Sequence, residues 1–93
     1  MVEVFNATGQ IGLARAATRM LRDQGIDVVY FGSDTANSLD STQVIVRRGR
    51  EDRAARVRRA LGAGSVRAAP DSSRLVDVTV RLGRDFGRLV RDP

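Results

Sequence analysis

The chain has 93 residues, of which 42% are hydrophobic and 29% charged, with a formal net charge of +5 and no cysteine, histidine or tryptophan. A chain of this length and composition folds as one small domain around a single core. Without cysteine or histidine it lacks the ligands of the usual zinc, haem and iron–sulfur sites and the bases of Ser-His and Cys-His nucleophile pairs. Most enzyme chemistry is therefore excluded, and no catalytic residue, metal or cofactor is predicted.

All 16 basic residues are arginine. This usage is typical of a GC-rich genome, and it also suits two-point contacts to anions. The positive charge predicts weak attraction to anions without specifying which anion. No apolar run is long enough for a membrane span, and no signal peptide pattern opens the chain.

The first predicted strand covers residues 2–6, where apolar and polar residues alternate. The stretch NATGQIGLARAA, residues 6–17, then predicts a tight glycine turn that leads into a helix over about 10–24. Ile11, Ala14 and Leu21 recur at helical spacing in that helix. Thr8 is its predicted N-cap, and Gly25 its predicted left-handed end.

The glycine turn also resembles a phosphate cradle. Its spacing, Gly9-Gln10-Ile11-Gly12, lacks the third glycine of a dinucleotide fingerprint and the lysine of a Walker A loop. We therefore interpret it as a structural turn, in which Gly9 adopts a positive φ and Gly12 lets the helix pack closely on the sheet. The alternative is that amide groups at the helix start meet an anion.

Residues 27–32 are nearly all apolar and predict an inner strand, parallel to the first because a helix joins the two. A polar surface loop is expected over 33–41 and a further strand over 42–48. The second predicted helix covers 50–61, with a thin apolar stripe at Ala54, Val57 and Leu61, and ends at Gly62.

Residues 65–70 predict a short edge strand that is closed by Pro70. The last predicted strand lies within 75–86, where Val76, Val78, Val80 and Leu82 alternate with a solvent-facing set of Asp77, Thr79, Arg81 and Gly83. Residues 87–93 are expected to form a flexible tail. The order β-α-β-β-α-β-β predicts an α+β two-layer sandwich, with a mixed sheet of four or five strands and two helices on one face.

Two sets of side chains are candidates for binding. Arginines on and before the second helix predict an anion- or polymer-binding flank, although a solvated helix face is the alternative: Arg47, Arg48, Arg53, Arg56 and Arg59. The four aromatic residues are interpreted as core side chains, and the alternative is that the pair Tyr30 and Phe31 offers one ring outward to a sugar or base.

Taken together, the chain resembles the LytR C-terminal domain, a module of LytR-CpsA-Psr cell-envelope proteins, so that residues 1–86 form the predicted domain. The resemblance covers VEVFNATGQIGLARAATRMLRDQGIDVVYFGSD, TQVIVRRGREDRAARVRRALG and VDVTVRLGRDF. Its marks are the opening Val2-x-Val4-x-Asn6-x-Thr8-Gly9, the helix start Gly12-Leu13-Ala14, Gly25, the strand Thr42 to Val46, the helix end Leu61-Gly62 and the closing Leu82-Gly83-x-Asp85-Phe86.

The resemblance implies a non-catalytic accessory module of the bacterial cell envelope. It implies an extracytoplasmic place, membrane anchoring through a segment outside this sequence, and contact with peptidoglycan, an anionic wall polymer or anionic lipid. One alternative is a protein-interaction or self-association module that pairs through the sheet's wet face or the strand at 65–70. A weak nucleic-acid binder is the other, and no specific nucleic acid is expected.

Overall fold

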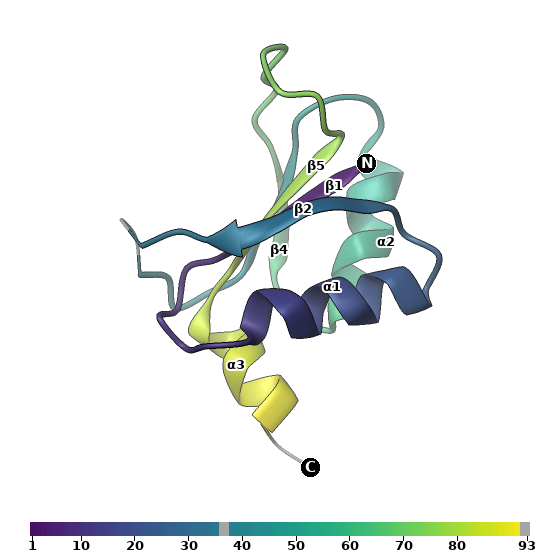
Figure 1. Cartoon of the computed structure of the whole chain (residues 1–93). Coiled ribbons are helices and arrows are strands. Elements are labelled where there is room, and N and C mark those ends of the chain that lie inside the picture. The colour runs from purple at the N-terminus through teal and green to yellow at the C-terminus, as the bar shows by residue number, and fades with distance from the viewer. Residues whose placement is uncertain (36–37, 92–93) are drawn as a thin grey trace.

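Within residues 1–35 and 38–91, which the computed structural model describes, five strands and three helices follow one another along the chain (Figure 1). They are β1 (Val2–Asn6), α1 (Leu13–Asp23), β2 (Val28–Ser33), β3 (Gln43–Val46), α2 (Glu51–Leu61), β4 (Ser65–Ala68), β5 (Val78–Leu82) and α3 (Arg84–Arg91). The predicted α+β sandwich is confirmed, and α3 is an addition to it. The loop predicted over 33–41 begins after β2, and its residues 36–37 lie outside the described part of the chain.

The strands form one mixed sheet in the order β2-β1-β5-β3-β4. β1 is parallel to both β2 and β5, as the helical crossover predicted for β2, whereas β3 is parallel to β4 and antiparallel to β5. The last strand of the chain therefore lies at the centre of the sheet.

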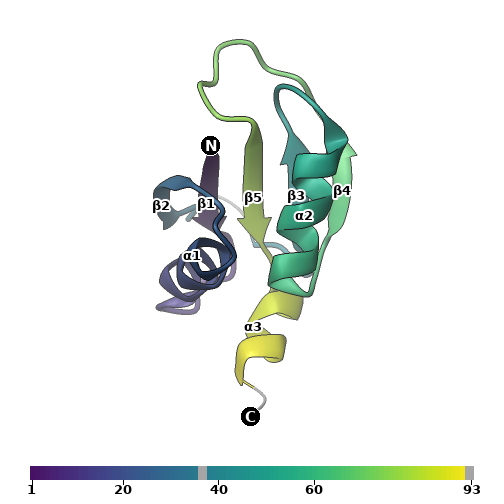
Figure 2. The ribbon, with the colours of Figure 1, turned by 90° about the vertical axis from the view of Figure 1, so that its right-hand side faces the viewer.

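The core lies between the sheet and its two longer helices. α1 packs on β1 and β2, α2 packs on β3 and β4, and the two helices also contact each other (Figure 2). Alternate residues of the inner strands face these helices because strand side chains point to the two faces in turn. The central strands contribute buried side chains to this core: Val2, Val4, Val44, Val46, Val78, Val80 and Leu82.

The prediction that residues 27–32 form an inner strand is wrong, because β2 is an edge strand. Val28 is buried, but Val29, Tyr30 and Phe31 are 49%, 54% and 38% exposed. Four consecutive apolar residues are compatible with both positions, and only the insertion of β5 beside β1 decides between them. The prediction that β4 is an edge strand is correct.

The predicted flexible tail is also wrong over residues 87–91, which belong to α3, while 92–93 lie outside the described residues. The strand ends at Leu82, so the alternation that predicted a strand to residue 86 stops at Gly83. Phe86 enters the core from the first turn of α3 and is fully buried. Burial of that one ring attaches the helix to the end of the sheet.

Asp85 and Thr42 join the start of α3 to the start of β3. The Asp85 carboxylate accepts hydrogen bonds from the Thr42 amide (2.9 Å) and hydroxyl (2.6 Å), and the Thr42 hydroxyl accepts one from the Gly83 amide (3.0 Å). Gly83 fits tightly here, since a β-carbon on it would lie 2.5 Å from the Ser41 carbonyl carbon. Thr42 is completely buried, so these bonds satisfy polar groups that water does not reach.

We expect Phe86→Ala to lower the free energy of unfolding by about 3–5 kcal/mol, the usual cost of truncating a buried aromatic ring. Leu89→Ala is the matched control on the same helix, because Leu89 is 46% exposed. Urea unfolding followed by circular dichroism measures both. A loss in Phe86→Ala no larger than that in Leu89→Ala would contradict the role of the Phe86 ring in attaching α3 to the sheet.

We expect Asp85→Ala to destabilise the domain by about 1–3 kcal/mol, because it leaves the buried Thr42 amide and hydroxyl without their acceptor. Asp40→Ala also removes a carboxylate beside α3, but its ion pair with Arg84 is exposed to solvent. Thermal unfolding of both variants compares the two carboxylates. A loss in Asp40→Ala as large as that in Asp85→Ala would contradict this assignment.

Candidate functional site

Asn6 and Thr8 hold the glycine turn together from within the chain. The Asn6 side-chain amide donates to the Gln10 carbonyl (2.7 Å), while its oxygen accepts from the Thr8 amide (3.0 Å) and hydroxyl (2.6 Å). The Thr8 hydroxyl also accepts a hydrogen bond from the Gln10 amide (2.9 Å). Asn6 is buried, and its polar atoms are satisfied by its own turn.

Both glycines of the turn have left-handed backbone, with φ of 77° at Gly9 and 92° at Gly12. The close packing predicted for Gly12 is wrong, since a β-carbon there would meet no atom within 4 Å. Gly12 is the N-cap of α1, which begins at Leu13, so the prediction of Thr8 as N-cap is wrong as well. Glycine is suited to this position because of its backbone conformation.

A groove of about 840 Å³ separates the glycine turn from the end of β2. Its lining includes the Phe31 ring, the Arg15 side chain and hydroxyl-bearing residues of both walls: Thr8, Ser33, Thr35 and Ser38. No side chain caps the amides at the start of α1. The alternative that these amides meet an anion stays a prediction.

The predicted arginines of α2 occupy one flank of that helix, beside the end of α1. Arg53 pairs with Asp77 (3.0 Å), and Arg56 donates to the carbonyl of Gln24, the C-cap of α1. Arg59 lines a shallow groove of about 390 Å³ with Gln24 and Arg56. Two of the three arginines thus contact neighbouring parts of the fold, while Arg59 makes no hydrogen bond or ion pair within the described residues.

Of the two remaining predicted arginines, Arg47 lies apart from that flank. Arg48 is exposed in the bend after β3, whereas the Arg47 side chain lies on the sheet face that carries no helix. Arg47 donates from Nε to the Thr79 hydroxyl (3.1 Å) and from Nη1 to the Ala69 carbonyl (3.0 Å). The structure therefore separates the five predicted arginines onto two faces of the molecule.

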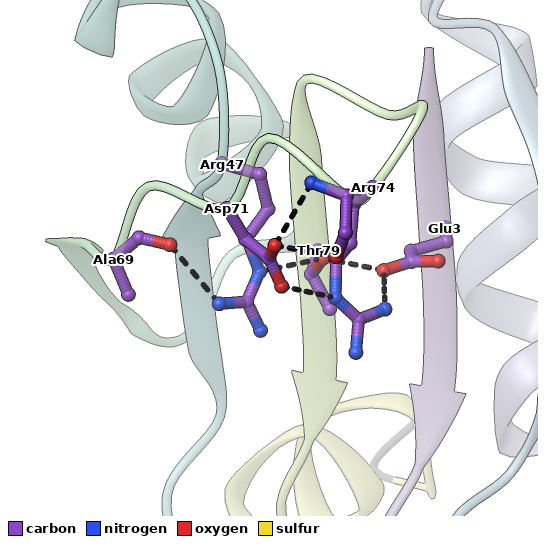
Figure 3. A network of polar contacts seen from close by, with 7 residues as sticks. Glu3, Arg47, Ala69, Asp71, Arg74 and Thr79 are labelled. Carbon is purple, nitrogen blue, oxygen red and sulfur yellow. Dashed lines mark hydrogen bonds and ion pairs between the residues drawn. The ribbon is translucent and has the colours of Figure 1, made fainter.

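Arg47 belongs to a network on this open face, which we define as the sheet face opposite α1 and α2 (Figure 3). The Thr79 hydroxyl donates to Glu3 (2.6 Å), and Arg74 pairs with the same carboxylate oxygen (2.6 Å) and with Asp71 (3.5 Å). Thr79 is consequently buried, so the prediction that it faces solvent is wrong. The loop before β5 covers its side of the strand.

The surroundings lower the pKa values of three groups in these contacts, Arg47, Asp71 and Asp77. Burial lowers the pKa of the Arg47 guanidinium, and the positive charge of Arg74 lowers it further. Hydrogen bonds from Ser73 lower the pKa of Asp71, and a hydrogen bond from the Met1 amino group lowers that of Asp77. Both carboxylates therefore stay ionised near neutral pH, and Asp77 remains a charged partner for Arg53.

A second row of arginines, which the sequence analysis did not predict as a candidate site, lies on the outer side of α1. Arg15, Arg19 and Arg22 follow each other at i, i+4 and i+7, a spacing that places them on one helix face. They line a groove of about 340 Å³ with Phe31 of β2. Arg22 donates to the Val28 carbonyl (2.8 Å), whereas Arg15 and Arg19 make no ion pair or hydrogen bond within the described residues.

The aromatic residues divide between the core and the surface. Phe86 is buried, while Tyr30 and Phe31 are exposed on opposite faces of β2, as their register with Glu3 and Val4 requires. The Tyr30 ring lies 5.6 Å from the ring of Phe5. The interpretation as core side chains is therefore correct for Phe86 and wrong for Tyr30 and Phe31, whose rings lie at the surface on different faces.

Neither metal sites nor membrane spans emerge from the described residues. No group of three or more acidic side chains there has the arrangement of a metal site. None of the helices in residues 1–35 and 38–91 is long and apolar enough to cross a membrane.

Comparison with known proteins gives two similarities. The family described as LytR cell envelope-related transcriptional attenuator matches residues 1–86. The solution structure of the C-terminal domain of RV0431 is similar, with 30% sequence identity and a TM-score of 0.56 over 88% of this chain and 70% of that chain. No curated protein matches the chain.

We expect Gly9→Ala to cost about 1–2 kcal/mol of folding free energy, because a residue with a β-carbon is strained at positive φ. Gly9→Asn should recover part of this loss, since asparagine tolerates the left-handed region. Chemical denaturation of the three proteins measures the order of stability. An unchanged midpoint for Gly9→Ala would contradict the interpretation of this turn.

Proposed function

The chain belongs to the LytR C-terminal domain family, whose members are accessory domains of cell-envelope proteins. We therefore propose that it is a non-catalytic module that binds an anionic polymer of the bacterial cell wall. The observation that carries the proposal is the arginine surface of α2. We define this surface as the exposed arginines on α2 and in the bend before it: Arg48, Arg50, Arg53, Arg56, Arg58 and Arg59.

This surface has more positive charge than its own acidic neighbours neutralise. Glu51 and Asp52 lie in the first turn of α2, and Arg50 pairs with Asp52 (3.2 Å). Arg58 donates to the Gly64 carbonyl, and the guanidinium groups of Arg48 and Arg59 form no ion pair or hydrogen bond with the described residues. The free guanidinium groups are therefore available to phosphate or carboxylate groups, which they bind through two parallel hydrogen bonds.

The side chains of α2 favour a polymer over a lipid surface. A helix that binds a membrane surface inserts large apolar side chains beside its basic residues. The large apolar residues of α2, Val57 and Leu61, are buried against the sheet, and none of the exposed large hydrophobic residues of the described chain belongs to α2. Repeated charges along an extended polymer match a row of arginines without any insertion.

Two side chains of the arginine surface of α2 are held in place by neighbouring parts of the fold. Arg53 and Arg56 are held by Asp77 and Gln24, which orders their side chains before a ligand arrives. Ordered side chains lose less conformational entropy on binding. We propose that the module works outside the cytoplasmic membrane, where wall polymers lie; anchoring by a segment outside these residues stays a prediction.

The test is co-sedimentation with cell-wall sacculi, with their anionic polymers present or chemically removed. We expect Arg56→Gln/Arg59→Gln to weaken retention about five- to tenfold, because each exposed charge contact contributes up to about 1 kcal/mol. The control is Arg15→Gln/Arg19→Gln, which removes the same charge from α1 and should retain most of the binding. Thermal unfolding verifies that both variants are folded.

Three results would overturn the proposal. Equal losses in the two double variants would reduce the binding to net charge, and undiminished retention on stripped sacculi would exclude the anionic polymer. Tighter binding to vesicles of anionic lipid, or to single-stranded or duplex DNA at the same salt concentration, would assign the surface to another ligand. Retention should also fall with added salt, because the contacts are exposed.

A further inference from the structure

The outer edge of β2 has no strand beside it among the described residues. The Asp34 amide donates to the Asn6 carbonyl (2.9 Å), so at this end of β2 it is Asp34 that faces β1. Amide groups of successive strand residues point to alternate sides, which directs the amides of Phe31 and Ser33 away from β1. These groups form an open row to which another strand can bind.

The two edges of the sheet differ in how they are protected. β4 has four residues, includes Arg67 and is followed by Pro70, features that hinder pairing with a further strand. β2 has six residues, without charge or proline, and three consecutive residues of it are exposed and apolar. Its one irregularity in register lies at its beginning, opposite Val2 and Glu3, so Tyr30–Ser33 is regular.

The surroundings of this edge differ on its two sides. On the helix side, Phe31 shares a groove with Arg15 and Arg19. On the open face, Tyr30 lies beside the Phe5 ring and over Gly32, where a β-carbon would approach the Tyr30 hydroxyl to 2.7 Å. A strand that adds here therefore meets positive charge on one face and an aromatic surface on the other.

From this pattern we propose that the edge of β2 binds an extended segment of another protein, in which acidic and apolar residues alternate, as a sixth strand of the sheet. Carboxylates of the segment face Arg15 and Arg19, and its apolar side chains cover Tyr30 and Phe5. Backbone hydrogen bonds provide affinity, and the alternation provides specificity. A second copy of this chain fits less well, because antiparallel pairing of two β2 strands brings the arginines of both copies together.

The proposal extends the proposed function, because it concerns the β2 side of α1 and not the arginines of α2. The Arg15→Gln/Arg19→Gln variant of the β2 side and the Arg56→Gln/Arg59→Gln variant of the arginine surface of α2 therefore serve as controls for each other. Loss of peptide binding with intact wall binding, or the reverse, separates the failure of one proposal from the failure of the other.

The test uses an end-blocked octapeptide of alternating glutamate and valine, titrated against the chain and followed by amide chemical shifts and hydrogen exchange. Binding should slow exchange of the Phe31 and Ser33 amides. Arg15→Gln/Arg19→Gln should weaken it about tenfold, while Arg56→Gln/Arg59→Gln leaves it nearly unchanged. Ser33→Pro, which removes an outward amide, should abolish it.

A second peptide tests the same strand hydrogen bonds even if the Ser33→Pro variant does not fold. The same peptide with alternate residues N-methylated cannot form the strand hydrogen bonds and should not bind. Equal binding of that peptide, of a block peptide of four glutamates and four valines, or of alternating lysine and valine would overturn the proposal. So would a dimer in sedimentation that Ser33→Pro dissociates, because the edge would then be occupied by a second copy.

Discussion

The insertion of β5 between β1 and β3 organises the sheet and, through it, the core. β5 pairs in parallel with β1 and antiparallel with β3, and thereby joins two units that would otherwise have separate sheets. Its inward residues, Val78, Val80 and Leu82, contribute to the core beneath both helices. Asp85 and Phe86 then secure its end, one through the buried Thr42 and the other through the core. Both strand neighbours of β5 are therefore placed by contacts between distant parts of the chain.

The two faces of the sheet differ in how their arginines are paired with acidic residues. On the open face, two arginines are matched by carboxylates, Arg74 by Glu3 and Asp71 and Arg81 by Asp34, and Arg47 donates to the Thr79 hydroxyl and the Ala69 carbonyl. Such pairing over a partly buried surface satisfies polar groups and leaves little charge for a ligand. On the helix side, the arginines outnumber the acids, and several have no partner among the described residues. The positive field of the protein consequently comes mainly from its helices, which is where both proposed binding surfaces draw their charge.

Residues that identify the family also have clear physical roles. Asn6, Thr8 and Gly9 build a turn that returns the chain from β1 toward α1. Gly83 permits close approach to Ser41, and Asp85 accepts the bonds of Thr42. These marks therefore maintain the scaffold. The proposed binding residues belong to other positions, on the outer sides of α1 and α2 and at the free edge of β2, where substitution changes a surface without changing the core.

The local structure of this protein follows from its amino-acid pattern. Alternation predicted β1 and the helix-facing side of β5, helical spacing predicted α1 and α2, and glycines marked their ends at Gly25 and Gly62, which both have positive φ. These features depend on residues close together in the chain. The same pattern did not predict that β2 is an edge, that Thr79 is buried, that Phe86 belongs to a helix or that Arg47 lies apart from Arg59. The edge position of β2, the burial of Thr79 and the place of Arg47 depend on which strands pair and on which segments cover each face of the sheet. These contacts join residues far apart in the sequence, and the periodicity of a short segment does not describe them.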